Sequence, residues 1–266
     1  MLVGAVTGLS LLAIVTPALA QAPSEVAVDG VTPSFALMDV DGERSKVEAE
    51  VGMGVTTKGA SAQLWSGRLR AQIMLDPTFG FYGTLQGGGV TSSNSDFGMG
   101  SPEAGGLIHL RPSANTNVSF HAGVAVSLLN DDSLGGELAA AAARPSDLAL
   151  VVGGTSWLRG GASAAFHDRS VFARLDLGFD QQIDAEDGDD NETLTHLNAG
   201  IGFGNQQWSA AAELQLLRVD GEHAETAGVS LHYRGKTAAP YLLITRPIGG
   251  DLFRDVITLS AGASFF

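Results

Sequence analysis

The chain of 266 residues contains no cysteine, so disulfide bonds cannot hold its fold together. It is also poor in basic residues: 15 Lys and Arg stand against 29 Asp and Glu, a formal net charge of −14. Strong nucleic-acid binding needs a basic surface, so this composition argues against it. After residue 20 the chain lacks any uninterrupted apolar run near the roughly 18 to 20 residues of a spanning helix. A helical membrane protein is therefore not expected.

What is present begins with an uncharged, apolar leader. Residues 1–20 end in Ala18-Leu19-Ala20, a small-x-small sequence that predicts a secretory signal peptide cleaved before Gln21. An N-terminal transmembrane anchor is the alternative, but Pro17 and the short apolar core favour removal. Residues 21–44 are expected to form an N-terminal periplasmic or lumenal segment, with one short strand at 35–40. No linker divides the remaining residues, 45–266, which are predicted to form one domain.

Residues 45–266 alternate between apolar and polar side chains with a period of two, which is typical of β-strands. In the first hairpin, a loop at 58–60 makes the indices of cross-strand partners sum to 118. Glu48 then lies opposite Arg70, and Glu50 lies opposite Arg68. These opposite-charge pairs on the polar face are expected to set the register of the hairpin.

Connections between the predicted strands alternate in length. Short ones are predicted at 76–79, 112–116, 167–170, 204–207 and 235–237, and longer ones at 91–102, 129–147, 184–193 and 247–254, while 57–61 and 220–224 are short loops on the longer side. Tight turns at one end and longer loops at the other are typical of outer-membrane barrels. Counting the segments gives about twelve strands, an even number that leaves both chain ends on the same side.

Three local predictions can be compared directly with a structure. The alanine run at 139–143 predicts a short helix within the long loop. Residues 148–166 are predicted to be one nearly continuous strand, longer than a span requires, which either projects past the membrane or breaks at Gly160-Gly161. A two-residue turn at Asn205-Gln206 would pair Phe203 with Trp208 and Asn198 with Glu213.

The last strand ends the chain on an aromatic residue. Ile257, Leu259 and Phe265 share one apolar face, whereas Phe266 falls on the polar face with Ser264. Such a strand resembles the closing strand of Gram-negative outer-membrane β-barrel proteins, although there the terminal aromatic usually shares the lipid-facing frame. The resemblance implies an all-β fold, a single antiparallel up-and-down transmembrane barrel with short periplasmic turns and longer extracellular loops. It also implies lipid and lipopolysaccharide as surroundings, and recognition of Phe266 by the barrel-assembly machinery.

A secreted, soluble β-sandwich is the alternative fold, because its strands alternate too. Consecutive strands of roughly ten residues, and charged side chains on the polar face, favour the barrel. Aromatic residues also gather at predicted strand ends, as an interfacial girdle requires: Trp65, Phe79, Phe81, Phe203, Trp208, Tyr233, Phe265 and Phe266.

The polar face supplies the candidate functional residues. In this register the expected pore-lining side chains are Glu48, Glu50, Arg68, Arg70, Gln72, Arg174, Asp176, Asp180, Glu213, His232 and Arg234. Charged clusters inside a barrel set ion selectivity, so an open channel is one interpretation. The other is a plug, because paired Arg and Glu side chains can fill a narrow lumen. The sequence leaves both open.

Other chemistry finds little support in the sequence. The six histidines show no His-x-Ser spacing of the kind that outer-membrane lipid hydrolases use, so no catalytic residue and no cofactor is predicted. The acidic stretch with Asp184, Glu186, Asp187, Asp189 and Asp190 offers weak candidate ligands for Ca²⁺ or Mg²⁺, and a solvated loop is the alternative. The expected function is passive diffusion of small polar solutes or ions. The rivals are a structural scaffold, an autotransporter-like translocator and a lipid hydrolase.

Overall fold

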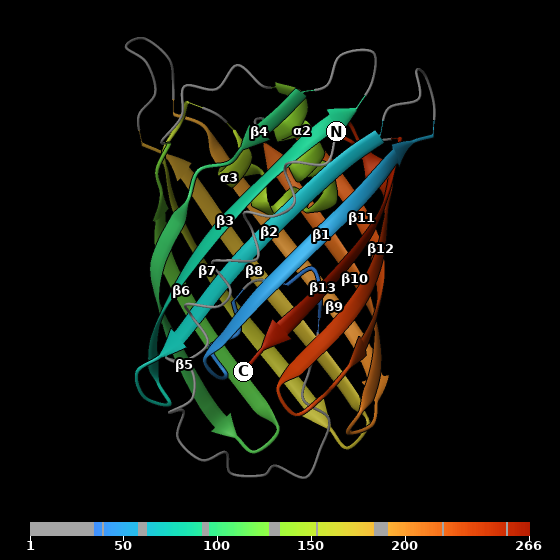
Figure 1. The fold of residues 1–266 in the computed structure, drawn as a ribbon. Coiled ribbons are helices and arrows are strands. Elements are labelled where there is room, and N and C mark those ends of the chain that lie inside the picture. The colour runs from blue at the N-terminus through green and yellow to red at the C-terminus, as the bar shows by residue number, and fades with distance from the viewer. Residues whose placement is uncertain are drawn as a thin grey trace.

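Twelve antiparallel strands form a closed barrel in the computed structural model, which describes residues 35–38, 40–57, 63–91, 96–127, 134–152, 154–183, 191–219, 221–253 and 255–266 (Figure 1). The predicted signal peptide and residues 21–34 lie outside this part of the chain. The barrel strands are β1 (Lys46–Thr56), β2 (Gln63–Met74), β3 (Phe79–Thr91), β5 (Glu103–Ser113), β6 (Thr116–Ala125), β7 (Trp157–Asp168), β8 (Val171–Gln182), β9 (Thr193–Gly204), β10 (Trp208–Val219), β11 (Glu222–Tyr233), β12 (Ala238–Gly250) and β13 (Val256–Phe265). A short additional strand, β4 (Asp96–Met99), pairs with the end of β3.

The barrel closes by pairing its first strand with its last. β1 runs antiparallel to β13, with Val47 opposite Phe265 and Thr56 opposite Val256. All other barrel neighbours follow one another in sequence, except that β3 pairs with β5 beyond the β4 insertion. Among the described strands, closure leaves the twelve barrel strands without a free edge, so each of them pairs on both sides, as a sheet in lipid must, whereas β4 pairs with β3 alone.

The two ends of the barrel differ in their connections. The connections at the end where the chain terminates, here called the short-turn end, are all tight, whereas the opposite, long-loop end carries the longer connections together with the short one between β10 and β11. The β6–β7 connection carries α2 (Leu134–Ala143), the 3₁₀ helix η2 (Pro145–Asp147) and α3 (Leu148–Val151), which confirms the short helix predicted at 139–143. These helices lie within the barrel at the long-loop end (Figure 1). None of the described helices is long and apolar enough to cross a bilayer.

The strand alternation sends apolar side chains outward and polar ones inward. Phe203, Val51 and Leu177 are 69%, 67% and 55% exposed on the outside, whereas Gln72 and Asp176 are fully buried inside. This is the reverse of a soluble sandwich, in which the apolar faces meet in the core. The pattern is that of a transmembrane β-barrel, and it confirms the predicted fold class.

Aromatic side chains mark the outer rim at the short-turn end. Phe79, Phe203 and Trp208 are exposed there, and the Trp208 ring lies 4.8 Å from that of Tyr233 on the neighbouring strand. Trp65, near the start of β2, is exposed toward the opposite end. Rings at these levels suit the membrane–water interface, where one side of the ring is apolar and the other wet.

Three local predictions are wrong. Residues 35–38 and 40 form no strand; they lie in the lumen, bonded to side chains of the wall. The strand predicted over 148–166 begins only at Trp157, because the apolar run from Leu148 forms α3 and packs inside the barrel. Periodicity alone does not distinguish a short buried strand from a buried helix.

The third correction concerns the β9–β10 register. The Asn205 side chain accepts hydrogen bonds from the amides of Gln207 and Trp208 at 2.8 and 2.9 Å, which makes the turn wider than two residues. Phe203 therefore pairs with Ala210, and Asn198 with Gln215. The shift is an even number of residues, so every side chain stays on its predicted face. The first hairpin has the predicted register, with Glu48 opposite Arg70 and Glu50 opposite Arg68.

Candidate functional site in the barrel lumen

The eleven side chains predicted for the polar face all lie on the inner face of the barrel. Ten of them are buried, and Arg234 lines a cavity at the short-turn end. The lumen around them is largely filled by two other parts of the chain. One is an extended segment before β1, the lumenal strap (residues 35–38 and 40–45). The other is the helical plug (α2, η2 and α3, residues 134–151).

The strap is anchored at its start by one carboxylate of the wall. Glu213 on β10 accepts hydrogen bonds from the backbone amides of Ala36 and Leu37, at 3.0 and 2.7 Å. The carbonyl of Leu37 accepts a bond from Gln215 at 3.0 Å. A carboxylate that receives two amide protons forms charge-assisted hydrogen bonds, which are stronger than neutral ones. Glu213 therefore holds the strap against β10.

Further along, the strap crosses to the opposite wall. Its carbonyls accept bonds from Arg70 at Met38 (3.3 Å) and from Arg174 at Val40 (3.1 Å). Gln72 then binds the strap three times, through the amide of Gly42, the side chain of Asp41 and the carbonyl of Arg44. Because buried peptide groups need partners, these polar wall residues allow an extended segment to lie inside the barrel.

Small residues make room for the strap. A Cβ at Gly200 would come within 2.5 Å of the Phe35 ring, and one at Gly228 within 2.9 Å of Leu37. The Phe35 ring also packs edge-on against Phe172, with centroids 5.1 Å apart. The wall and the strap therefore fit closely by shape as well as by hydrogen bonding.

Two arginines join the helical plug to the wall. Arg144 binds Asp147 within the plug (3.2 Å) and Glu50 on β1 (3.3 Å), and it also donates to the carbonyl of Ala36 in the strap. Arg159 on β7 binds Glu103 at 2.9 Å and Asp180 at 3.1 Å. Its Nη2 donates to the Ser146 carbonyl of the plug at 3.2 Å. Such networks neutralise charges that would otherwise be costly to bury.

An apolar cluster holds the plug against the wall. Its fully buried members are Ala125, Ala149, Leu150 and Trp157, packed with Leu194 from β9 and Leu217 from β10. Phe253, from the connection before β13, packs against the same cluster. Water is excluded from such a cluster, so the plug is held at the long-loop end by hydrophobic contact as well as by ion pairs.

The inner face also brings together Ser230, His232 and Glu213. Ser230 Oγ donates to Glu213, and His232 Nε2 lies 3.0 Å from the same hydroxyl. In a hydrolytic triad the imidazole lies between the hydroxyl and the carboxylate, whereas here the hydroxyl lies between the other two. Ser230 is fully buried and Glu213 is bound to the strap. This arrangement positions the strap anchor and does not resemble an activated nucleophile.

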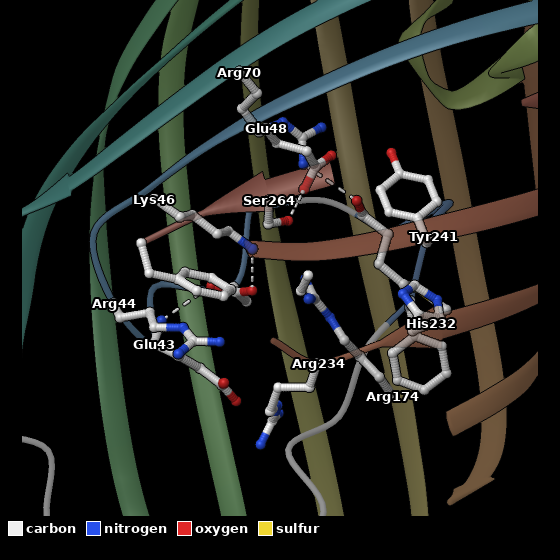
Figure 2. A pocket seen from close by; sticks show the side chains of 15 residues that line it. Glu43, Arg44, Lys46, Glu48, Arg70, Arg174, His232, Arg234, Tyr241 and Ser264 are labelled. Atoms are coloured by element: carbon white, nitrogen blue, oxygen red, sulfur yellow. Dashed lines mark hydrogen bonds and ion pairs between the residues drawn. The ribbon is translucent and has the colours of Figure 1, made fainter. Parts of the chain in front are cut away.

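A cavity of about 60 Å³ remains at the short-turn end, between the strap and the wall (Figure 2). It is lined by five cationic and three acidic side chains: Arg44, Lys46, Arg70, Arg174 and Arg234, with Asp41, Glu43 and Glu48. Lys46 binds Asp41 at 2.5 Å, and Glu48 receives a bond from Arg68 on the neighbouring strand. The cavity is therefore more positive than the strongly acidic chain as a whole. We call it the cationic cavity.

Two strap carboxyls have opposite titration behaviour. Burial raises the pKa of Asp41, but the nearby Lys46 and Arg174 charges outweigh it and hold that pKa below its ordinary value. Burial and the neighbouring Asp41 charge instead hold the pKa of Glu43 above its ordinary value. Glu43 accepts a hydrogen bond from Asn117 at 2.8 Å. In the plug, Arg144 and Arg159 overcome burial and lower the pKa of Asp147.

Sequence reasoning missed several residues that organise this lumen. Arg159 and Glu103 lie on strand faces that alternation could have assigned to the inside, because their neighbours Leu158 and Ala104 are exposed. Arg144 and Asp147 gave no such signal, since the loop that carries them has no periodicity. The five candidate metal ligands at 184–190 lie outside the described residues. In the part of the chain that the structure describes, no group of three potential metal ligands is found.

No family model and no curated protein matches the chain. Solved structures similar to it include the COG4313 outer membrane channel from Pseudomonas putida F1, with a TM-score of 0.65 and 11% identity over 88% of this chain and 99% of that one. The NanC porin has a TM-score of 0.55 and 9% identity, over 83% and 99% of the two chains. The KdgM porin, in complex with disordered oligogalacturonate, has a TM-score of 0.52 and 10% identity, over 83% and 98%. This chain therefore has the fold of outer-membrane porins and channels.

Proposed function

We propose that this chain is a porin-like channel of the bacterial outer membrane, through which small polar solutes or ions diffuse passively. The observation that carries the proposal is the inner face of the barrel. Buried charges line its middle and continue to the short-turn end, where they surround a cavity inside a wall whose outer face is apolar. A charged lumen in an apolar shell suits solute passage and its selectivity. The proposal assigns no catalysis to these residues.

Passage requires a change in the lumen, and the strap is the element best suited to make it. Polar contacts of the strap, such as those with Glu213 and Gln72, can exchange for water in a hydrated lumen. The plug is in addition packed against the wall through the apolar cluster around Leu150 and Trp157, whose exposure to water is costly. We therefore place the gate at the strap.

The same proposal fixes the orientation and the regions of the chain. The short-turn end faces the periplasm and the long-loop end faces outward, toward lipopolysaccharide. Residues 1–20 are a signal peptide, 21–44 an N-terminal periplasmic or lumenal segment, and 45–266 the transmembrane barrel. The barrel-assembly machinery recognises the last strand through Phe266. In the closed barrel, Arg44 lies over the Phe266 ring, 3.4 Å from its centroid, so recognition would precede that contact.

Single-channel recording in planar bilayers tests the function. The wild-type barrel should conduct in rare openings, and Glu213→Gln should increase the open fraction about tenfold or more. The reason is that a hydrogen bond to a charged group contributes about 1.5–3 kcal/mol, and each 1.4 kcal/mol is a factor of ten. Glu222→Gln, at an exposed position at the start of β11, is the matched control and should leave the open fraction unchanged.

A second candidate function, a structural scaffold with a plugged lumen, is favoured by the anchored plug and the bound strap. The recording separates the two functions. If folded wild-type protein and folded Glu213→Gln both leave the bilayer silent, the scaffold replaces the channel as the function of this barrel. Folding of each variant is checked by the shift in electrophoretic mobility on heating.

A further inference from the structure

Arg70 differs from the other buried arginines of the lumen. It is 6% exposed, and among the described residues its guanidinium makes a single hydrogen bond, from Nη1 to the carbonyl of Met38 at 3.3 Å. Its Nε has no hydrogen-bond partner among the described residues. Glu48 lies directly opposite in the register, but the carboxylate of Glu48 is bound to Arg68. Within the described part of the chain, Arg70 therefore carries a buried charge without a carboxylate partner.

Such a charge is costly to bury unless an anion compensates it. The other buried arginines have their anions in the wall or the plug: Arg68 binds Glu48, Arg144 binds Glu50 and Arg159 binds Glu103. For Arg70 the adjacent space is the cationic cavity, which its side chain lines. Figure 2 shows Arg70 on the same cavity as Lys46, Arg174 and Arg234.

We propose that the cationic cavity is a binding site for a small monovalent carboxylate, with Arg70 as its principal ligand. A planar guanidinium matches the two oxygens of a carboxylate, so that two parallel hydrogen bonds form. Lys46 and Arg174 already hold Asp41 and Asp176, at 2.5 and 2.6 Å, and they contribute to the positive potential around the bound anion.

The size of the cavity limits the ligand. A buried water needs roughly 10–15 Å³ of such volume, so 60 Å³ has room for about four to six waters. An anion of the size of acetate fits within that space, and an aromatic carboxylate such as benzoate does not. The cavity therefore selects by size as well as by charge.

This inference deepens the proposed function, because it rests on the lumen being the path of solutes and names the class of solute held there. Binding can nevertheless be measured whether or not the barrel conducts. Saturable acetate binding with silent bilayers would leave the site in place and remove the channel. Conducting channels without acetate binding would leave the channel in place and remove the site.

Isothermal titration calorimetry of the folded, detergent-solubilised protein with sodium acetate tests the site, with sodium benzoate as the oversized anion. The wild type should bind acetate saturably and benzoate not at all. Arg70→Gln should weaken acetate binding about tenfold or more. Arg218→Gln, at an exposed position on the outer face of β10, should leave it unchanged. The proposal is overturned if the wild type binds no acetate, or if Arg70→Gln binds it as tightly as the wild type.

A second variant covers the case in which Arg70→Gln does not fold. Arg70→Lys keeps the positive charge but loses the planar pair of donors. It should weaken acetate binding several-fold while changing chloride binding less. An equal effect on both anions, or no effect on acetate, would show that Arg70 does not hold a carboxylate.

Discussion

Glu43 makes the attachment of the strap dependent on pH. Its half-buried carboxyl accepts a hydrogen bond from Asn117 and lies near Asp41, Lys46, His109 and Arg174. Burial and the Asp41 charge raise its pKa above the ordinary value of 4.5, against the opposing effect of the three basic groups. A group with a raised pKa contributes stability that is fully present below its ordinary pKa and is lost as the pH rises through the raised one. Asp41 has a lowered pKa, so it stays ionised above pH 4.5 and adds no pH dependence there.

We therefore expect the strap to loosen as the pH rises above 4.5 through the raised pKa of Glu43. The open fraction in planar bilayers should increase over that range in the wild type. In Glu43→Gln, which cannot ionise, the open fraction should stay nearly constant. A wild-type open fraction that falls as the pH rises, or an equal rise in Glu43→Gln, would contradict this account.

The sequence predicted the register of the first hairpin and one of its two ion pairs, Glu50 with Arg68, but not the pairing of Glu48. Glu48 lies opposite Arg70 and Glu50 opposite Arg68, as the alternation indicated. Arg68 nevertheless binds Glu48 and lies 3.6 Å from Glu50, while Arg70 turns to the strap. Long side chains reach diagonal neighbours across a sheet, and a segment inside the lumen competes for them. Which group each of these arginines binds thus depends on contacts between residues that lie far apart in the sequence.

The strap can lie close to the barrel wall because some inner-face positions, such as position 200, are glycine and have no side chain. Val at position 200 suits a strand but would place methyl groups where the Phe35 ring and Met38 lie. Gly200→Val should therefore displace the start of the strap while leaving its polar anchors unchanged. The open fraction in planar bilayers should rise, as in Glu213→Gln, with the barrel still folded.

Gly67→Val is the matched control for this substitution. A Cβ at Gly67, on β2, would meet no atom within 4 Å, so the added side chain has room. Its open fraction should equal that of the wild type. If Gly200→Val conducts no more often than Gly67→Val, the strap is not the gate.

The strands could be predicted from the sequence and the elements inside the barrel could not. Period-two alternation reports which face of a strand is buried, and it placed Asp176, Asp180 and Glu213 correctly on the inner face. The segments 35–45 and 134–151 have no such period. The apolar run from Leu148 is consistent with either a strand or a buried helix, and only the contacts of Leu150 with Trp157 and Leu194 decide. Docking inside the lumen is a long-range property that local patterns do not encode.

The whole molecule has its apolar surface outside and its charges inside. From this arrangement we predict how strongly an arginine on the outer face destabilises the barrel at different depths in the bilayer. Val171 and Leu177 lie on the same outer face of β8, Val171 beside the short turn and Leu177 near the middle of the strand. An arginine at the bilayer midplane of a barrel costs about 2–4 kcal/mol, and one near the interface about 0–1 kcal/mol. Leu177→Arg should therefore lower the free energy of unfolding from phospholipid vesicles, measured by urea titration, by about 2–4 kcal/mol. Val171→Arg should lower it by no more than about 1 kcal/mol.

If both variants unfold like the wild type, the outer face does not meet hydrocarbon. If both lose the same large amount, the loss arises from the strand and not from depth in the membrane.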